Sequence, residues 1–145
     1  MNPGNSSLVN IESALVVDDS LVQRNHAVNL CTQLGIKMIH QAADGAQALE
    51  LLRTLNPLPT VLLIDLEMPG MDGVELVQQL YADDFHIALI IASGRDPAMI
   101  QSVEKMIEAL GLPLIGSLKK PIRIEPLQDL LYRLSVRRSA GRFKA

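Results

Sequence analysis

The sequence predicts an α/β fold in which one parallel sheet of five strands is covered by helices on both faces. Apolar runs of strand length alternate with longer stretches of helical period, and the alternation occurs five times. Several strand candidates are aliphatic throughout, which is typical of strands buried on both faces. Short right-handed crossovers then favour a single flavodoxin-like (βα)5 doubly wound sheet with strand order 2-1-3-4-5.

The strand candidates differ in character along the chain. The run "ALVV" is apolar and stops at Asp18 and Asp19, whereas "IKMIHQ" is less apolar and indicates a strand near the sheet edge. The run "TVLLI" ends at Asp65, and "IALIIA" ends at Ser93. We expect the strands at residues 14–17, 36–41, 60–64, 87–92 and 112–118.

Helices fill the intervals between the strands. Gly35 can stop the first helix, Asp44 can cap the second, and Pro97 suits the first turn of the fourth, where a missing N–H costs little. We expect helices at residues 20–34, 45–55, from about 73 onward, 97–110 and 125–136. The first helix should turn one apolar face inward, made of Leu21, Val28, Cys31 and Leu34.

Length and composition limit the class of protein. The chain of 145 residues fits one domain that can bury a core without disulfides. No apolar run approaches the roughly 20 residues that cross a bilayer, and the N-terminus lacks a secretory signal pattern, so we expect a cytoplasmic protein without a membrane span. We divide the chain into a flexible N-terminal segment (1–12), a folded domain (13–137) and a basic C-terminal tail or start of a linker (138–145).

Charge and cysteine content exclude further classes. The net charge of -3 and the 3% of aromatic residues argue against direct nucleic acid binding by this domain. Cys31 is the single cysteine, which excludes an intrachain disulfide and a cysteine-rich zinc site. We expect it to be a small buried side chain on a helix.

Polar side chains follow four of the five predicted strands. Asp18 and Asp19 follow the first strand, Asp65 follows the third, Ser93 the fourth and Lys120 the fifth. In an open parallel sheet the ligand site lies beyond the carboxyl ends of the strands, where the strand order reverses. Strands one and three are neighbours in the expected order, so three carboxylates should meet there.

A cluster of three carboxylates calls for a cation, because one pair 4 Å apart costs about 4 kcal/mol at an effective dielectric near 20. Oxygen ligands without His or Cys favour Mg²⁺. A carboxylate beside Mg²⁺ can also be a nucleophile, since aspartyl phosphate is an established intermediate. Mg²⁺, the Lys120 ammonium and the Ser93 hydroxyl with nearby amides would each take a phosphoryl oxygen.

Four motifs now carry a family resemblance. "LVVDD", "LLIDLEMPGMDG", "IIASG" and "LKKP" occur in this order at the strand ends. With them the chain resembles the receiver domain of bacterial two-component response regulators over roughly residues 13–137. The resemblance implies that Asp65 is the phosphoacceptor, that Asp19 binds Mg²⁺ directly, and that Asp18 acts partly through metal-bound water. The backbone carbonyl of Glu67 would complete the metal ligands.

The lysine of the family motif is assigned by its neighbour. Lys120 directly precedes Pro121, as in the family, and Lys119 should point to the other sheet face. The Lys120–Pro121 bond is a candidate cis peptide. Many receivers place an aromatic switch residue three positions before the lysine, and here that position is Ser117. The usual aromatic form of the output switch is therefore not expected.

The resemblance implies a switch controlled by phosphorylation and not an enzyme. A sensor histidine kinase or a phosphotransfer protein would phosphorylate Asp65, and the domain would assist its own phosphorylation and dephosphorylation. The change would reach an output domain, a target protein or a homodimer partner through the fourth helix, the fifth strand and the last helix. The segment "LGLPLIGSLKKPI" is similar to the end of receivers that precede cyclic-di-GMP phosphodiesterase domains.

Two alternatives remain at this point. A Mg²⁺-dependent phosphatase of the haloacid-dehalogenase type also uses an aspartate at a strand end, but it usually has a second aspartate two residues later, where this chain has Glu67. A degenerate receiver would serve only as an interaction module. We expect no metal or phosphoryl role for His26, His40 and His86, because none reaches the predicted site.

Overall fold

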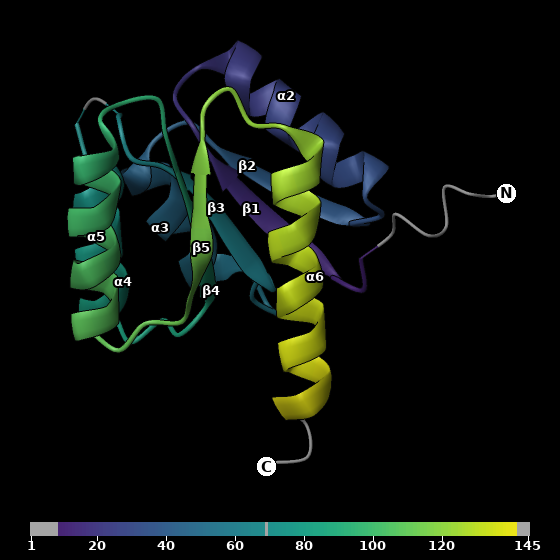
Figure 1. The fold of residues 1–145 in the computed structure, drawn as a ribbon. Coiled ribbons are helices and arrows are strands. Elements are labelled where there is room, and N and C mark those ends of the chain that lie inside the picture. The colour runs from purple at the N-terminus through teal and green to yellow at the C-terminus, as the bar shows by residue number, and fades with distance from the viewer. Residues whose placement is uncertain (1–8, 69, 142–145) are drawn as a thin grey trace, which may run out of the picture.

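The computed structural model describes residues 9–68 and 70–141, with residues 139–141 described as helical backbone only. Five parallel strands form one sheet in the order β2-β1-β3-β4-β5 (Figure 1), which confirms the predicted topology. The strands are β1 (Ser13–Val17), β2 (Met38–Ala42), β3 (Val61–Asp65), β4 (Ala88–Ser93) and β5 (Leu114–Lys119). The helices are α2 (Leu21–Gln33), α3 (Gly45–Thr54), α4 (Gly73–Ala82), α5 (Pro97–Ala109) and α6 (Ile124–Gly141).

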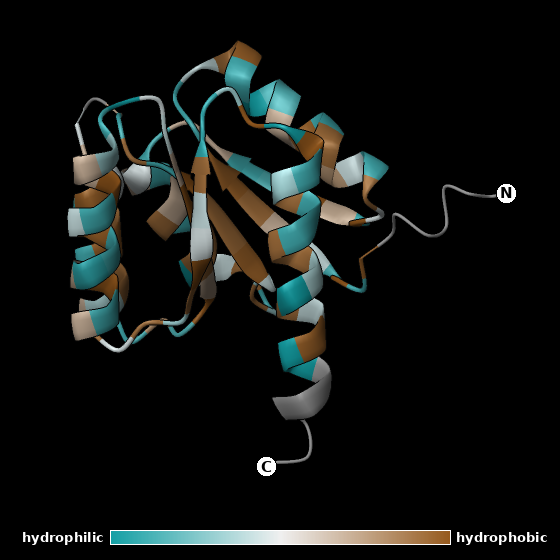
Figure 2. Cartoon of the chain, in the orientation of Figure 1, coloured by the Kyte–Doolittle hydropathy of each residue, from teal (hydrophilic) through white to brown (hydrophobic). Residues whose placement is uncertain are grey.

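Helices cover both faces of the sheet, as the aliphatic strands predict. Helices α2 and α6 pack on one face, and α3, α4 and α5 pack on the other. Every residue of β1 and β3 is buried, because alternate side chains enter the two cores. The central strands are accordingly apolar in Figure 2. Within the described residues no helix is long and apolar enough to cross a membrane.

The strand register brings the polar strand ends to one rim of the sheet. Val17 of β1 pairs with Ile64 of β3, so the aspartates that follow these two residues lie at the same level. On the other side of β3, Ser93 at the end of β4 pairs with Lys119, one residue before Lys120. Three neighbouring strand ends and the segment after β5 therefore meet at a single edge.

Local signals place the helix starts as predicted. The Asp44 carboxylate caps α3 by accepting the Gln47 N–H at 2.8 Å, and Pro97 lies in the first turn of α5. Asp72 forms a capping box with Glu75 at the start of α4. Strand β2 lies at the sheet edge, as its polar composition predicts.

The inward face predicted for the first helix is wrong at Leu21, whose side chain is 60% exposed. The buried face of α2 is made of Ala27, Leu30 and Cys31, and it continues into the C-cap Leu34. At 100° per residue, Leu21 lies roughly 120° around the helix from the centre of that face. Spacing alone therefore identified some of the buried positions but not the centre of the stripe.

The N-terminal segment is packed where the structure describes it. Val9 and Ile11 are buried, and the Val9 N–H donates to the Leu34 carbonyl at 2.9 Å. Val9 and Ile11, which the sequence analysis assigned to a flexible segment, therefore pack against the domain. Residues 1–8 lie outside the described residues.

Helix α6 is longer than the sequence pattern predicts. It continues past Val136 to Gly141, so the first part of the predicted basic tail (138–145) is helical. Arginine and alanine have high helix propensity, and Gly141, a poor helix former, is the last residue of α6. Residues 142–145 lie outside the described residues.

Gly73 permits close contact between the start of α4 and the end of β3. A Cβ at this position would lie 2.6 Å from the Asp65 carbonyl oxygen and 2.8 Å from the Leu66 Cα, both backbone atoms. We expect Gly73→Ala to lower the free energy of unfolding by about 1–3 kcal/mol in urea denaturation. Gly94→Ala is the control, because its Cβ would meet the Lys120 Cβ at an ordinary 3.7 Å. Equal loss of stability in both variants would contradict this account.

Candidate functional site

The three predicted carboxylates meet at the rim of the sheet. Asp18, Asp19 and Asp65 each offer an oxygen, and these atoms lie within 4.8 Å of one another. Asp18 and Asp65 are buried, whereas Asp19 is exposed and opens the cluster to solvent. Asp18 is held from α2, because its Oδ1 accepts the Ser20 N–H at 2.9 Å and its carbonyl accepts Arg24 Nη1 at 2.8 Å.

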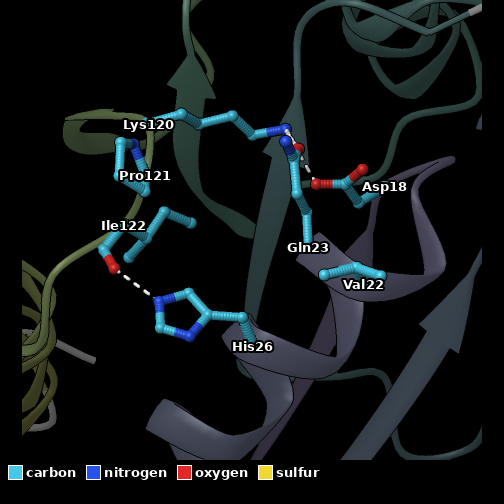
Figure 3. Close-up of a pocket in the computed structure, with 7 residues that line it drawn as sticks. All are labelled: Asp18, Val22, Gln23, His26, Lys120, Pro121 and Ile122. Carbon is cyan, nitrogen blue, oxygen red and sulfur yellow. Dashed lines mark hydrogen bonds and ion pairs between the residues drawn. The ribbon is translucent and has the colours of Figure 1, made fainter.

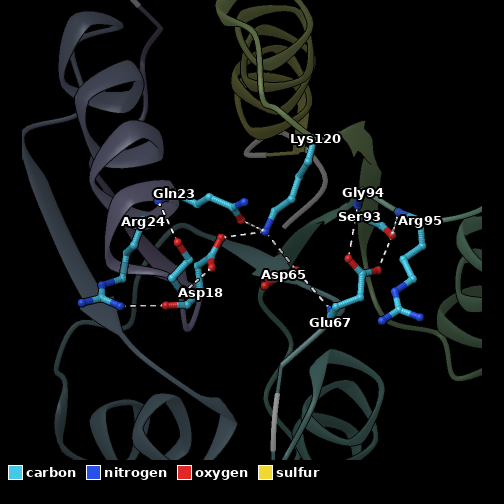
Figure 4. Close-up of polar contacts among 10 residues, drawn as sticks. Asp18, Gln23, Arg24, Asp65, Glu67, Ser93, Gly94, Arg95 and Lys120 are labelled. Carbon is cyan, nitrogen blue, oxygen red and sulfur yellow. Dashed lines mark hydrogen bonds and ion pairs between the residues drawn. The ribbon is translucent and has the colours of Figure 1, made fainter.

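The Lys120 ammonium lies between the two buried carboxylates (Figure 4). Its Nζ donates to Asp18 Oδ2 at 2.8 Å and forms an ion pair with Asp65 Oδ1 at 3.1 Å. The Lys120–Pro121 peptide bond is cis, as predicted. Lys119 is exposed, so the structure brings the expected lysine of the pair to the site.

Ser93 is fully buried, and its hydroxyl donates to the Glu67 carboxylate (Figure 4). The Gly94 N–H donates to the other oxygen of the same carboxylate at 3.2 Å, and the Arg95 N–H donates to Ser93 Oγ at 3.0 Å. The Glu67 N–H also donates to Asp65 Oδ1 at 3.1 Å. The side chain of Glu67 is therefore part of the site, in addition to the backbone carbonyl that the resemblance implies as a metal ligand.

The pKa values of Asp65 and Lys120 are both raised, but for different reasons. Burial raises the pKa of Asp65 to about 6, although the Lys120 charge and the Glu67 N–H lower it. For Lys120, burial lowers the pKa, but the hydrogen bond to Asp18 and the charge of Asp65 outweigh burial and raise it above its ordinary value. At neutral pH the site therefore holds an ionised Asp65 beside a protonated lysine.

The donor set fits a hard divalent cation. The cluster contains three carboxylates and neither His nor Cys among the described residues. His26 bonds to the Ile122 carbonyl and His86 to Asp84, so both imidazoles have other partners. A solvent-exposed hollow beside Asp19 and Asp65 leaves room for an ion that keeps several waters.

Gln23 is a site residue that the sequence analysis did not predict. It comes from the first turn of α2, and its Oε1 accepts a hydrogen bond from Lys120 Nζ at 2.6 Å. The sequence signal that could have identified Gln23 is its position three residues after the helix cap Ser20. A cap at Ser20 starts the helix there, and so places Gln23 in the first turn beside the end of β1.

The sequence matches the family model of the response regulator receiver domain over residues 14–132. The chain belongs to this family. The predicted resemblance is thus confirmed, and this receiver domain has the fold that the family implies.

Curated relatives place the receiver in different protein contexts. It is 33% identical over 126 residues to the Cyclic di-GMP phosphodiesterase RocR of Pseudomonas aeruginosa, covering 87% of this chain but 32% of that protein. It is 30% identical over 119 residues to the Sporulation initiation phosphotransferase F of Bacillus subtilis, covering 81% of this chain and 89% of that protein. The chain thus spans about a third of one relative and most of the other.

A solved structure agrees with the topology. The crystal structure of a response regulator from Colwellia psychrerythraea superposes with a TM-score of 0.74 at 28% sequence identity. The match covers 88% of this chain and 99% of that chain. The fold of the receiver is therefore shared over nearly the whole of both chains.

Because the pKa of Asp65 is raised in the folded chain, ionisation of this residue should lower the free energy of unfolding. Between its ordinary pKa of 3.8 and about 6, the folded chain binds the Asp65 proton more tightly than the unfolded chain does, so the residue's contribution to stability falls as pH rises. In chelator, Asp65→Asn should be more stable than the unsubstituted protein above pH 6, by about 1 kcal/mol after allowance for solvent screening. The two proteins should converge below pH 4 in urea denaturation.

Asp83→Asn is the control of opposite sign. Hydrogen bonds from Arg53 and Gln79 lower the pKa of the Asp83 carboxyl, so its ionisation favours the folded chain. This variant should be less stable than the unsubstituted protein at neutral pH and equally stable in acid, where Asp83 is protonated. A stability difference for Asp65→Asn that does not vary with pH would contradict the assigned cause.

Proposed function

We propose that this receiver takes a phosphoryl group onto Asp65 and so switches an output surface. The donor would be a phosphohistidine on a sensor histidine kinase or a phosphotransfer protein. The observation that carries the proposal is the Lys120 ammonium held 3.1 Å from Asp65, opposite the donors of Ser93 and Gly94. A nucleophile with cationic and hydrogen-bonding groups around it is what phosphoryl transfer requires.

Mg²⁺ fits this role, and Asp18, Asp19, Asp65 and the backbone carbonyl of Glu67 would hold it. When bound, the ion would neutralise charge on the transferred group. The protein's own groups supply the remaining steps.

Each of the other residues has a distinct task in the proposed transfer. The Asp65 carboxylate forms the new P–O bond while the P–N bond of the phosphohistidine breaks, and the imidazole leaves with the electron pair. The Lys120 ammonium neutralises one phosphoryl oxygen, and the Ser93 hydroxyl with the Gly94 N–H binds another. Asp18 orients the lysine through its 2.8 Å contact.

The side chain of Glu67 competes with the phosphoryl group in this proposal. Its carboxylate accepts from Ser93 and Gly94, the two donors that a phosphoryl group on Asp65 would use. Phosphorylation adds about -1.5 to -2 charges beside Glu67, so the carboxylate would be displaced. Ser93 and Gly94 would then bind the phosphoryl group on Asp65 instead, which would draw Ser93 inward and reposition the loop after β4.

The proposed output surface is formed by α5, β5 and α6. Ser117 of β5, at the position where many receivers have an aromatic residue, donates to the Glu104 carboxylate of α5 at 2.5 Å. This hydrogen bond joins two elements of that surface. The exposed Tyr132 and Val136 lie one turn apart on α6 and offer apolar contacts to an output domain, a target protein or a second receiver. The likeness to RocR makes control of cyclic di-GMP hydrolysis one such output.

Phosphorylation of Asp65 is tested by labelling. With a phosphodonor and Mg²⁺, we expect one hydroxylamine-sensitive phosphoryl group per chain, and none in Asp65→Ala. Asp129→Ala, which removes an exposed carboxylate on α6, should be labelled normally. Persistent labelling of Asp65→Ala would refute the assignment.

The same experiment separates the two alternatives. Turnover of a free phosphomonoester would indicate a phosphatase of the haloacid-dehalogenase type. Failure of the unsubstituted protein both to bind Mg²⁺ and to be labelled would indicate an interaction module.

Removing the Glu67 charge should speed phosphorylation. Glu67→Gln keeps the backbone carbonyl but weakens the hold on Ser93 and Gly94 and removes repulsion of the donor. We expect the rate constant of labelling by a small acyl phosphate to rise roughly three- to tenfold. Glu50→Gln, at an exposed position of α3, is the matched control and should not change the rate. A slower Glu67→Gln variant would mean that the carboxylate assists the transfer.

A further inference from the structure

We propose that Gln23 is a positioning residue for the Lys120 ammonium, an inference that rests on the proposed transfer to Asp65. Gln23 Oε1 lies 2.6 Å from Lys120 Nζ, whereas the oxygens of Asp18 and Asp65 lie at 2.8 and 3.1 Å (Figure 4). An ammonium group has three N–H donors, so these three acceptors engage all of them. Gln23 therefore completes the set of contacts that fixes the lysine.

Gln23 differs from the other two acceptors because its amide oxygen carries no net charge. Asp18 and Asp65 also belong to the carboxylate cluster, so their oxygens are shared between the ammonium and any cation held there. Asp65 changes again when it carries a phosphoryl group. Gln23 lies outside that cluster, so its oxygen would stay available to Lys120 in each of these states.

The position of Gln23 is fixed by α2. Its backbone N–H donates to Ser20 Oγ at 3.2 Å, which closes the first turn of the helix. One turn further along, His26 Nε2 donates to the Ile122 carbonyl at 2.7 Å, two residues beyond Lys120 (Figure 3). Helix α2 thus holds the segment after β5 at two points, one on the lysine side chain and one on the backbone.

Gln23 also lines two adjoining hollows. One contains Asp65 and Lys120, and the other is formed with Val22, His26 and Ile122 (Figure 3). Without the amide, water would replace it as the third partner of the ammonium. Water has no fixed attachment to α2, so the lysine would lose a directional constraint while keeping its charge.

The contact is tested first without any phosphodonor. Gln23→Leu keeps similar bulk but removes the acceptor, so hydrogen exchange of the Lys120 ammonium, measured by ¹⁵N NMR in metal-free protein, should become several-fold faster. Gln23→Glu restores an acceptor and should restore slow exchange. Gln33→Ala, at the exposed end of α2, is the control and should match the unsubstituted protein. Unchanged exchange in Gln23→Leu would overturn the inference.

The chemical role is tested by a kinetic double-mutant cycle with acetyl phosphate and Mg²⁺. Gln23→Leu should lower the labelling rate constant roughly three- to tenfold when Lys120 is present, and it should have no further effect on Lys120→Ala. Equal reductions in both backgrounds would overturn the positioning role, because Gln23 would then act independently of the lysine. Absence of labelling in the unsubstituted protein would instead refute the proposed function, and ammonium exchange would still decide the Gln23 contact.

Discussion

The rim of this receiver depends on one electrostatic arrangement, the Lys120 ammonium between two buried carboxylates. Asp18 and Asp65 belong to a cluster whose like charges repel, and burial further penalises ionisation of Asp65. The ammonium offsets both effects, and the carboxylates in turn keep it protonated despite burial. The three side chains are therefore interdependent, and removal of the ammonium would leave two buried carboxylates without a compensating charge.

The fold supplies this arrangement from strands that are far apart in the sequence. β1, β3 and β4 are parallel and in register, so residues at their carboxyl ends arrive at one edge. This much could be predicted from the sequence, because an aliphatic run that stops at Asp18 or Asp65 marks both a buried strand and the polar group at its end. The sequence also identified Lys120, since its proline neighbour distinguishes it from Lys119.

The other contacts of the site depend on the directions of side chains, which the order of residues in the sequence does not determine. Gln23 meets a lysine 97 positions away, and Glu67 turns a long side chain towards Ser93, 26 positions away. Both are polar residues with several rotatable bonds, so neither periodicity nor burial restricts them in advance. The sequence shows that position 117 has a serine in place of the aromatic residue. Only the packing of α5 against β5 shows that the Ser117 hydroxyl donates a hydrogen bond to the Glu104 carboxylate.

The length of α6 carries the end of the domain away from the sheet. Its 18 residues form a rod of roughly 27 Å, and Figure 1 shows its last turns extending beyond the edge of the sheet. A tilt of about 5° at the base of such a rod moves its tip by roughly 2 Å. The last turn of α6 therefore lies far from the sheet, and a small rotation of the helix at the sheet would displace this turn by a larger distance.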